Sequence, residues 1–166
     1  MPSQTWRQTD TRRVAELFKD IDICMFVTHA DGSVRGRPMS NNGKVEYDGD
    51  SWFFSYRDSP KVEEIEADPT VELAYIATER GTWVSIEGTA QVIEDDARKR
   101  ELWDQELAAW FKDGPDDDNV VLLKVSADRI HAWADGKELA GSAETGLTVI
   151  NLPTLEEYFV DIKFTF

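Results

Sequence analysis

The fold is decided by residues 52–93, which read WFFSYRDSPKVEEIEADPTVELAYIATERGTWVSIEGTAQVI. The stretch opens on a strand-like aromatic run. Ser59-Pro60 then predicts the start of a helix, because serine caps helices and proline fits the first helical position, and Asp68-Pro69 ends it after about two turns. Residues 71–77 and 82–93 alternate as half-buried strands do. A strand, a short helix and two further strands are therefore predicted here.

Further elements are predicted on both sides of this stretch. Residues 23–28 are rich in strand formers, and the turn at 30–33 joins them to residues 34–40 as a hairpin. Gly88 predicts a bulge or a sharp bend in the longest strand. The remaining elements are helices from Thr9 or Asp10 to Lys19 and from 95 to 111, and strands at 120–125 and 129–134. Many strands with short turns predict a mainly β fold, an antiparallel barrel that is closed or nearly closed, with short helices as caps.

Length and charge limit the class of protein. The chain has 166 residues and a net charge of −15. Its length predicts one main domain at 1–136, with a tail at 137–166 packed on it, and alternation at 160–166 predicts a terminal strand in that tail. The negative charge repels phosphate backbones and acidic membrane surfaces, so neither nucleic acid nor a membrane is expected as a partner. No apolar run reaches the ~20 residues that span a membrane.

Cysteine and histidine are scarce in the chain. Cys24 is the single cysteine, so no internal disulfide can form, and its apolar neighbours predict a buried side chain. This free thiol and the polar N-terminal residues predict a reducing, cytoplasmic location. With only His29 and His131 as histidines, no metal centre of thiolates or imidazoles is expected.

Positive side chains gather around the short helix predicted after Ser59, despite the acidic composition. They are Arg35, Arg37, Arg57 and Lys61. Lys61 holds the second helical position, where a cation opposes the helix dipole by ~0.3–1 kcal/mol. Ser55, Tyr56 and Ser59 add hydroxyl groups to the free N–H groups of the helix start. Together these groups predict a phosphate cradle.

A flat apolar surface is predicted beside this cradle. Trp52, Phe53 and Phe54 precede it in the sequence, and residues 37–39 are expected to run alongside them. A ligand with one phosphate and one planar ring would use both features, and flavin mononucleotide (FMN) fits that description. Pyridoxal phosphate, another monophosphate on a flat ring, also fits.

Four segments of the chain resemble one known family. They are RGRPMS at 35–40, WFFSYRDSPKVEEIEADPTVELAY at 52–75, WVSIEGTAQVIED at 83–95, and ELWDQELAAWFKDG at 101–114 followed by VVLLKVSADRIHAW at 120–133. Over roughly residues 10–136 the chain is similar to the general stress protein branch of the pyridoxamine 5′-phosphate oxidase-like superfamily. The resemblance implies an FMN-binding split β-barrel that forms a homodimer, with flavin held in clefts at the dimer interface.

The resemblance also assigns residues to the flavin. Those expected along the isoalloxazine ring are Arg37, Pro38, Met39 and Ser40, and those expected to continue this wall are Phe54, Ser55 and Tyr56. Ser59 and Lys61 are expected to hold the phosphate. Trp83 and Trp133 match positions that approach the flavin, and Trp83 is expected to come from the second subunit.

Departures from the oxidases bear on activity. Asn42 and Pro60 stand where the oxidases carry a lysine and an arginine, and residues 137–140 lack the arginine-x-histidine pattern that grips the substrate phosphate. Oxidation of pyridoxamine phosphate is therefore disfavoured, FMN retention weaker than in the oxidases is expected, and no catalytic acid, base or nucleophile is identified.

Several hypotheses stay open from the sequence. The first is a flavin-dependent redox activity, and the alternatives are a pyridoxamine-phosphate-oxidase-like enzyme or a non-catalytic interaction module. FAD is an alternative to FMN. Trp103, Trp110 and Phe111 stand at helical spacing, which predicts packing against the barrel or a dimer partner.

Overall fold

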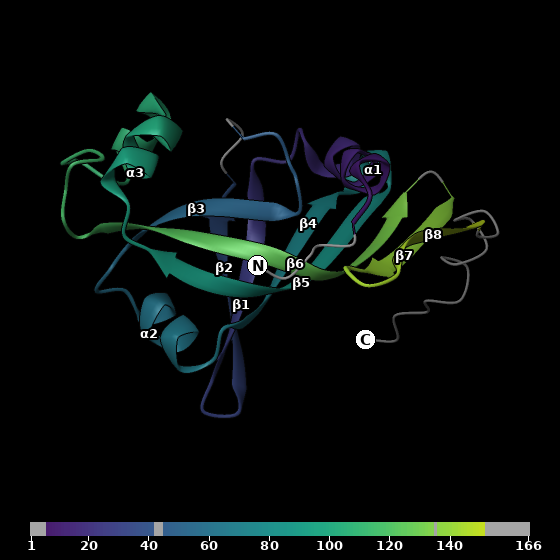
Figure 1. Cartoon of the computed structure of the whole chain (residues 1–166), viewed down its shortest axis with the longest axis horizontal. Coiled ribbons are helices and arrows are strands. Elements are labelled where there is room, and N and C mark those ends of the chain that lie inside the picture. The colour runs from purple at the N-terminus through teal and green to yellow at the C-terminus, as the bar shows by residue number, and fades with distance from the viewer. Residues whose placement is uncertain (1–5, 42–44, 135, 152–166) are drawn as a thin grey trace, which may run out of the picture.

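One antiparallel sheet organises the chain. The structure, a computed structural model, describes residues 6–41, 45–134 and 136–151. Seven of its eight strands follow the order β2-β1-β4-β5-β6-β7-β8, and β3 pairs with β6 outside that order (Figure 1). The strands are β1 Ile23–Ala30, β2 Ser33–Ser40, β3 Asp50–Tyr56, β4 Thr70–Ala77, β5 Thr82–Ile93, β6 Val120–Ala134, β7 Lys137–Ser142 and β8 Gly146–Asn151. The helices are α1 Gln8–Phe18, α2 Pro60–Ala67 and α3 Asp96–Leu102, with 3-10 turns η1 Thr78–Arg80 and η2 Gln105–Ala109. The predicted mainly β, antiparallel fold with short helices is confirmed.

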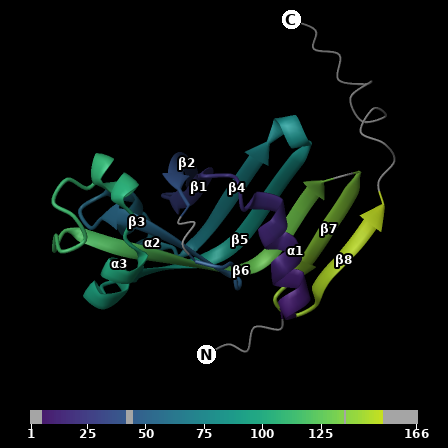
Figure 2. The ribbon, with the colours of Figure 1, turned by 90° about the horizontal axis from the view of Figure 1, so that it is seen from above.

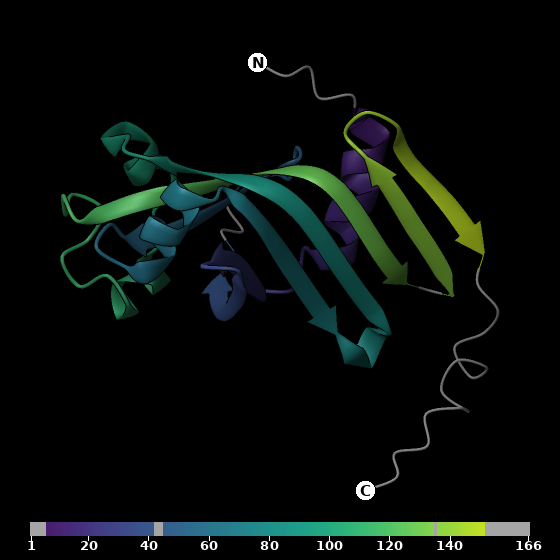
Figure 3. The same cartoon turned by 90° about the horizontal axis from the view of Figure 1, so that it is seen from below.

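β6 is one long strand where two strands were predicted. Its first half pairs with β3, from Val120 opposite Tyr56 to Ser126 opposite Asp50, and its second half pairs with β7. β5 pairs with both halves, and Figure 3 shows β5 and β6 running together along the molecule. The prediction of separate strands was wrong because each half of β6 finds its own partner. Ser126, one of the polar residues between the predicted strands, pairs with Asp50 of β3 and with Thr89 of β5.

A bulge interrupts the pairing of β5 with β6. The register shifts between Glu87 and Gly88. A Cβ atom at Gly88 would lie 2.6 Å from the carbonyl oxygen of Ser126, so a larger residue fits only if the backbone moves. The bulge that Gly88 predicted is therefore confirmed.

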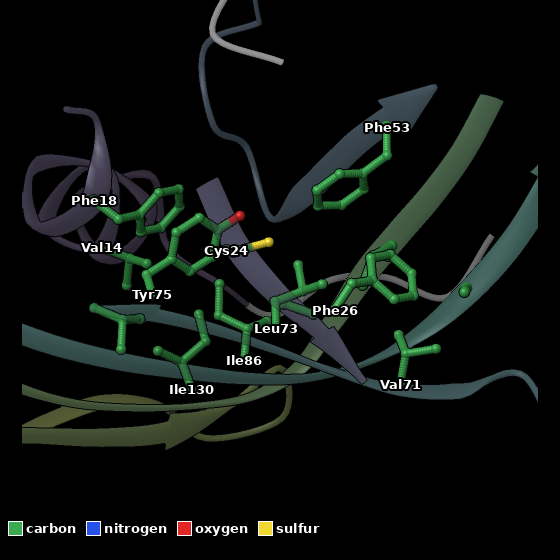
Figure 4. Packing of buried hydrophobic residues seen from close by; sticks show 14 of the residues in the cluster. Val14, Phe18, Cys24, Phe26, Phe53, Val71, Leu73, Tyr75, Ile86 and Ile130 are labelled. Atoms are coloured by element: carbon green, nitrogen blue, oxygen red, sulfur yellow. The ribbon is translucent and has the colours of Figure 1, made fainter. Parts of the chain in front are cut away.

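The core lies on the inner face of the sheet, where α1 packs against it (Figure 4). Alternate residues of β1, β4 and β5 point inward, among them Phe26, Leu73 and Ile86, which are at most 1% exposed. Phe18 of α1 stacks on Tyr75 with ring centroids 4.4 Å apart. Burial of each such side chain stabilises the fold by ~1.5–3 kcal/mol.

The chain after residue 136 continues the sheet. β7 and β8 form a hairpin on the second half of β6. The carboxylate of Asp10 in α1 accepts a hydrogen bond of 3.4 Å from the N–H of Leu147 and so ties the helix to this hairpin. Asp10 is buried inside α1, which begins at Gln8, so the N-cap expected at Thr9 or Asp10 is wrong. The terminal strand predicted at 160–166 lies outside the described residues.

The helix predicted from 95 to 111 is interrupted. α3 ends at Leu102 because Trp103 is extended, with φ −63° and ψ 134°. Asp104 then caps a 3-10 turn by accepting a hydrogen bond of 3.0 Å from the N–H of Glu106. The break changes which side chains are covered. Trp110, predicted to pack at helical spacing, is 59% exposed.

Cys24 is expected not to react in the folded protein. Its side chain is 1% exposed, and burial raises the pKa of the thiol to about 12. The thiolate that attacks disulfide reagents is therefore almost absent at pH 8. We expect an aromatic disulfide reagent to release no colour from the native protein and one equivalent per chain in guanidinium chloride. Rapid reaction of the native protein would contradict this burial.

Candidate functional site

A cavity of about 470 Å³ opens at the end of the sheet where β3 leads into α2. In Figure 2, α2, α3 and β3 gather at this end of the molecule. The lining comes from the start of β1, the ends of β2 and β3, the first turn of α2 and the segment around η2. The lining residues are Ile23, Pro38, Met39, Ser40, Phe54, Ser55, Tyr56, Lys61, Leu107, Trp110 and Phe111. The fold thus brings five separate segments to one cavity.

Most of the residues predicted to hold a flavin line this cavity. They come from β2, β3 and α2 and are Pro38, Met39, Ser40, Phe54, Ser55, Tyr56 and Lys61. The predicted residues outside the lining are Arg37, Ser59, Trp83 and Trp133. The lining residues that the sequence did not indicate are Ile23, Leu107, Trp110 and Phe111. Their only sequence signal was an apolar pattern, which packing explained equally well.

The apolar wall of the cavity rests on a second buried cluster. Phe54 is 5% exposed and forms a T-shaped pair with the Trp103 ring at 5.5 Å between centroids. Tyr56 tilts against Phe111 at 5.0 Å, and its hydroxyl donates to the carbonyl oxygen of Trp110 over 2.9 Å. Such aromatic pairs stabilise by ~0.5–1.5 kcal/mol beyond their burial. The wall is therefore held in place by the protein itself.

The start of α2 brings polar groups to the cavity. Ser59 stands at the N-cap position and Pro60 at the first helical position, as predicted. The Ser59 hydroxyl makes no capping hydrogen bond and instead lies 3.1 Å from the hydroxyl of Ser55. The two hydroxyls thus form a pair beside a helix start, where the dipole favours an anion.

Lys61 is the cation of the cavity. Its side chain is half-buried among the lining residues. Burial lowers the pKa of Lys61, the charge of Arg37 lowers it further, and Glu64 opposes both. Among the residues that the structure describes, no carboxylate lies within ion-pair distance of this ammonium group. The positive charge of Lys61 therefore lacks a paired negative charge, and a ligand anion would supply one.

The other cations near α2 are paired with carboxylates of the protein. The pairs and their N–O distances are Arg35–Glu64 at 2.9 Å, Arg37–Glu64 at 2.8 Å, Arg57–Glu66 at 3.2 Å and Arg57–Glu94 at 3.0 Å. The sequence indicated only that the four cations gather around this helix. The fold supplies carboxylates to the three arginines, from α2 and from the end of β5, and these pairs neutralise part of their charge.

Trp83 and Trp133 belong to an apolar row on the outer face of the sheet. Ile76 stands opposite Trp83, and Trp83 stands opposite Trp133. The pairing of β1 with β4 includes Met25 opposite Ala74, and this register continued by two residues would bring Ile23 beside Ile76. Ile23 and Ile76 are 48% and 53% exposed. We call these four residues, Ile23, Ile76, Trp83 and Trp133, the outer row. The row begins at the cavity, because Ile23 also lines it. Three strand spacings of ~4.8 Å place Trp133 about 14 Å from Ile23.

Two features are absent from the described part of the chain. Within residues 6–41, 45–134 and 136–151, no helix has the length and apolarity needed to cross a membrane. Over the same residues, no group of three or more histidine, cysteine, aspartate or glutamate side chains is placed to hold a metal ion.

Comparison with known proteins gives one family. The model for proteins described as "Pyridoxamine 5'-phosphate oxidase like" matches residues 9–149. General stress protein 26 of Bacillus subtilis is 30% identical over 114 residues, which are 66% of this chain and 81% of that protein. Protein bli-3 of Neurospora crassa is 26% identical over 100 residues, or 55% of this chain, and the match covers only 48% of bli-3.

Solved structures agree with the sequence matches. The crystal structure of the general stress FMN/FAD binding protein of Xanthomonas citri has a TM-score of 0.67 at 23% identity, covering 78% of this chain and 91% of that chain. Such neighbours are split barrels, which confirms the fold that the four segments implied. Because the family model spans most of the sequence, the chain belongs to the pyridoxamine 5′-phosphate oxidase like family.

Proposed function

We propose that this protein holds FMN in the cavity and that a second copy of the chain completes the site. The observation that carries the proposal is Lys61, a half-buried cation with a lowered pKa beside an apolar aromatic wall. A phosphate on a planar ring matches both parts of this cavity. A neighbour of the same fold is described as an FMN/FAD binding protein, which supports a flavin as the ligand.

Each part of the cavity has a role in this proposal. Lys61 binds the phosphate, assisted by the hydroxyls of Ser55 and Ser59 at the start of α2. Pro38 and Met39 on β2 orient the ring, and the wall around Phe54 excludes water from it. A bound flavin supplies electron or hydride transfer, and the chain positions it and controls access.

The outer row supports a homodimer as the complete form of the site. Trp83 and Trp133 do not line the cavity, but the outer row leads from the cavity to them and is exposed at Ile23 and Ile76. A two-fold axis brings the same face of two chains together. We propose that this contact places Trp83 of the second copy over the flavin. The free, buried Cys24 fits the reducing cytoplasm as the location of such a dimer.

The test is a titration of the purified protein with FMN, FAD, riboflavin and pyridoxal phosphate, followed by flavin fluorescence and absorption. We expect saturable FMN binding with a micromolar Kd and a rise in Tm, since a ligand at ~100 times its Kd stabilises the folded state by ~2.7 kcal/mol. An interaction module without cofactor predicts an unchanged Tm with all four compounds. If pyridoxal phosphate binds more tightly than FMN, the ligand of the cavity is pyridoxal phosphate and the proposed flavin is wrong.

A further inference from the structure

Glu64 is a buried carboxylate on the same helix as Lys61, and the proposed function gives it no role. Its side chain is 7% exposed. One oxygen accepts a hydrogen bond of 2.9 Å from Arg35, and the other accepts one of 2.8 Å from Arg37 and one from the Thr28 hydroxyl. Arg37 also donates to the Thr28 hydroxyl over 2.6 Å. Glu64 therefore holds two guanidinium groups at once.

The carboxylate of Glu64 is ionised at neutral pH. Burial alone would raise the pKa of Glu64, but hydrogen bonds from Thr28 and Arg37, the charge of Arg37 and a hydrogen bond from Arg35 lower it below its ordinary value. A negative charge therefore stays one helical turn after Lys61. It neutralises part of the positive charge that three cations place around the start of α2.

Arg37 directly precedes three cavity-lining residues on β2. The three residues that follow it, Pro38, Met39 and Ser40, all line the cavity, whereas Arg37 does not. Its charge nevertheless contributes to the lowered pKa of Lys61, so the two cations lie within electrostatic reach of each other. Arg37 is 22% exposed, and its guanidinium is directed to Glu64. Since Glu64 stands one helical turn after Lys61 and Arg37 already acts on Lys61, a guanidinium released from Glu64 would add its uncompensated positive charge near an anion held by Lys61.

We infer that Glu64 determines how strongly the site prefers a phosphorylated flavin over an unphosphorylated one. By retaining Arg37, it leaves Lys61 as the main cation for the headgroup and limits the contribution of the phosphate to affinity. This inference rests on the proposed function. It adds a specificity-determining residue that does not itself line the cavity.

The experiment compares Kd for FMN and for riboflavin in three variants and the unaltered protein. In Glu64→Gln, the ratio of the riboflavin Kd to the FMN Kd should rise about tenfold, because the released Arg37 adds one charge-assisted contact to the phosphate. Glu63→Gln, on an exposed position of the same helix, is the matched control and should leave the ratio unchanged. The double variant Arg37→Gln/Glu64→Gln should lose the rise, because it removes the released cation.

The double variant also keeps the experiment informative if Glu64→Gln misfolds. Replacing both partners of a buried ion pair disturbs a fold less than replacing one, so we expect the double variant to fold even if Glu64→Gln does not. A ratio in the double variant well below that of the unaltered protein would show that Arg37 already contacts the phosphate, which overturns the inference. An unchanged ratio in folded Glu64→Gln overturns it as well. If the unaltered protein binds no flavin, the proposed function fails first and takes the inference with it.

Discussion

Ile76→Asp is expected to separate the dimer and to abolish retention of flavin, while leaving the fold of the single chain intact. Ile76 stands in the middle of the outer row and is 53% exposed in the chain by itself. An aspartate there remains solvated in the monomer, and such surface substitutions usually change stability by less than ~0.5 kcal/mol. In the dimer the same carboxylate would be buried without a partner, against apolar side chains of both copies.

The size of this effect follows from the cost of burying a charge. An unpaired buried ion costs several kcal/mol, so the Kd for FMN should rise by ~100-fold or more if the second copy completes the site. Val34→Asp is the matched control, because Val34 is 66% exposed at the tip of the β1–β2 hairpin, outside the outer row. Light scattering gives the mass of each variant, and fluorescence gives its Kd. Dimeric Ile76→Asp protein with unaltered FMN affinity would disprove the role given to the outer row.

Lys61→Glu is expected to raise the Kd for FMN by ~100-fold or more, while the Kd for riboflavin changes by less than about threefold. The substitution removes a charge-assisted hydrogen bond, which contributes ~1.5–3 kcal/mol, and places a negative charge against the phosphate. Riboflavin has the same ring and no phosphate, so its contacts with the apolar wall remain. The ratio of the two affinities therefore isolates the headgroup.

The control for Lys61→Glu is Lys137→Glu, which makes the same change of net charge at an exposed position of β7. Both variants should retain the Tm of the unaltered protein within a few degrees. Titration of each with FMN and riboflavin separates an effect on the phosphate from an effect on the whole cavity. Equal losses for the two flavins in Lys61→Glu would mean that Lys61 does not hold the phosphate.

The features that could be predicted from the sequence depend on neighbouring residues. Ser59-Pro60 begins α2 where expected, because cap and proline act through the backbone of the first turn. Gly88 marked its bulge because a Cβ atom would meet the backbone of β6. The residues of β2 and β3 that line the cavity were also predictable, because the segments at 35–40 and 52–75 resemble those of a known family.

The features that could not be predicted depend on contacts between distant segments. Nothing near Arg35 or Arg37 shows that Glu64, on a helix reached after another strand, will hold both guanidinium groups. Trp110 had the spacing of a packed helical residue, but the helix ends before the extended Trp103 and Trp110 lines the cavity. Local patterns give secondary structure, whereas charge pairing and exposure follow from the whole fold.

Native mass spectrometry of the unaltered protein with excess FMN tests the proposed dimeric flavin site most directly, because one mass reports both the number of chains and the bound flavin. We expect a dimer with one FMN for each chain, and the loss of both features together in Ile76→Asp. Monomers that carry FMN, or dimers that carry none at saturating concentrations, would contradict it.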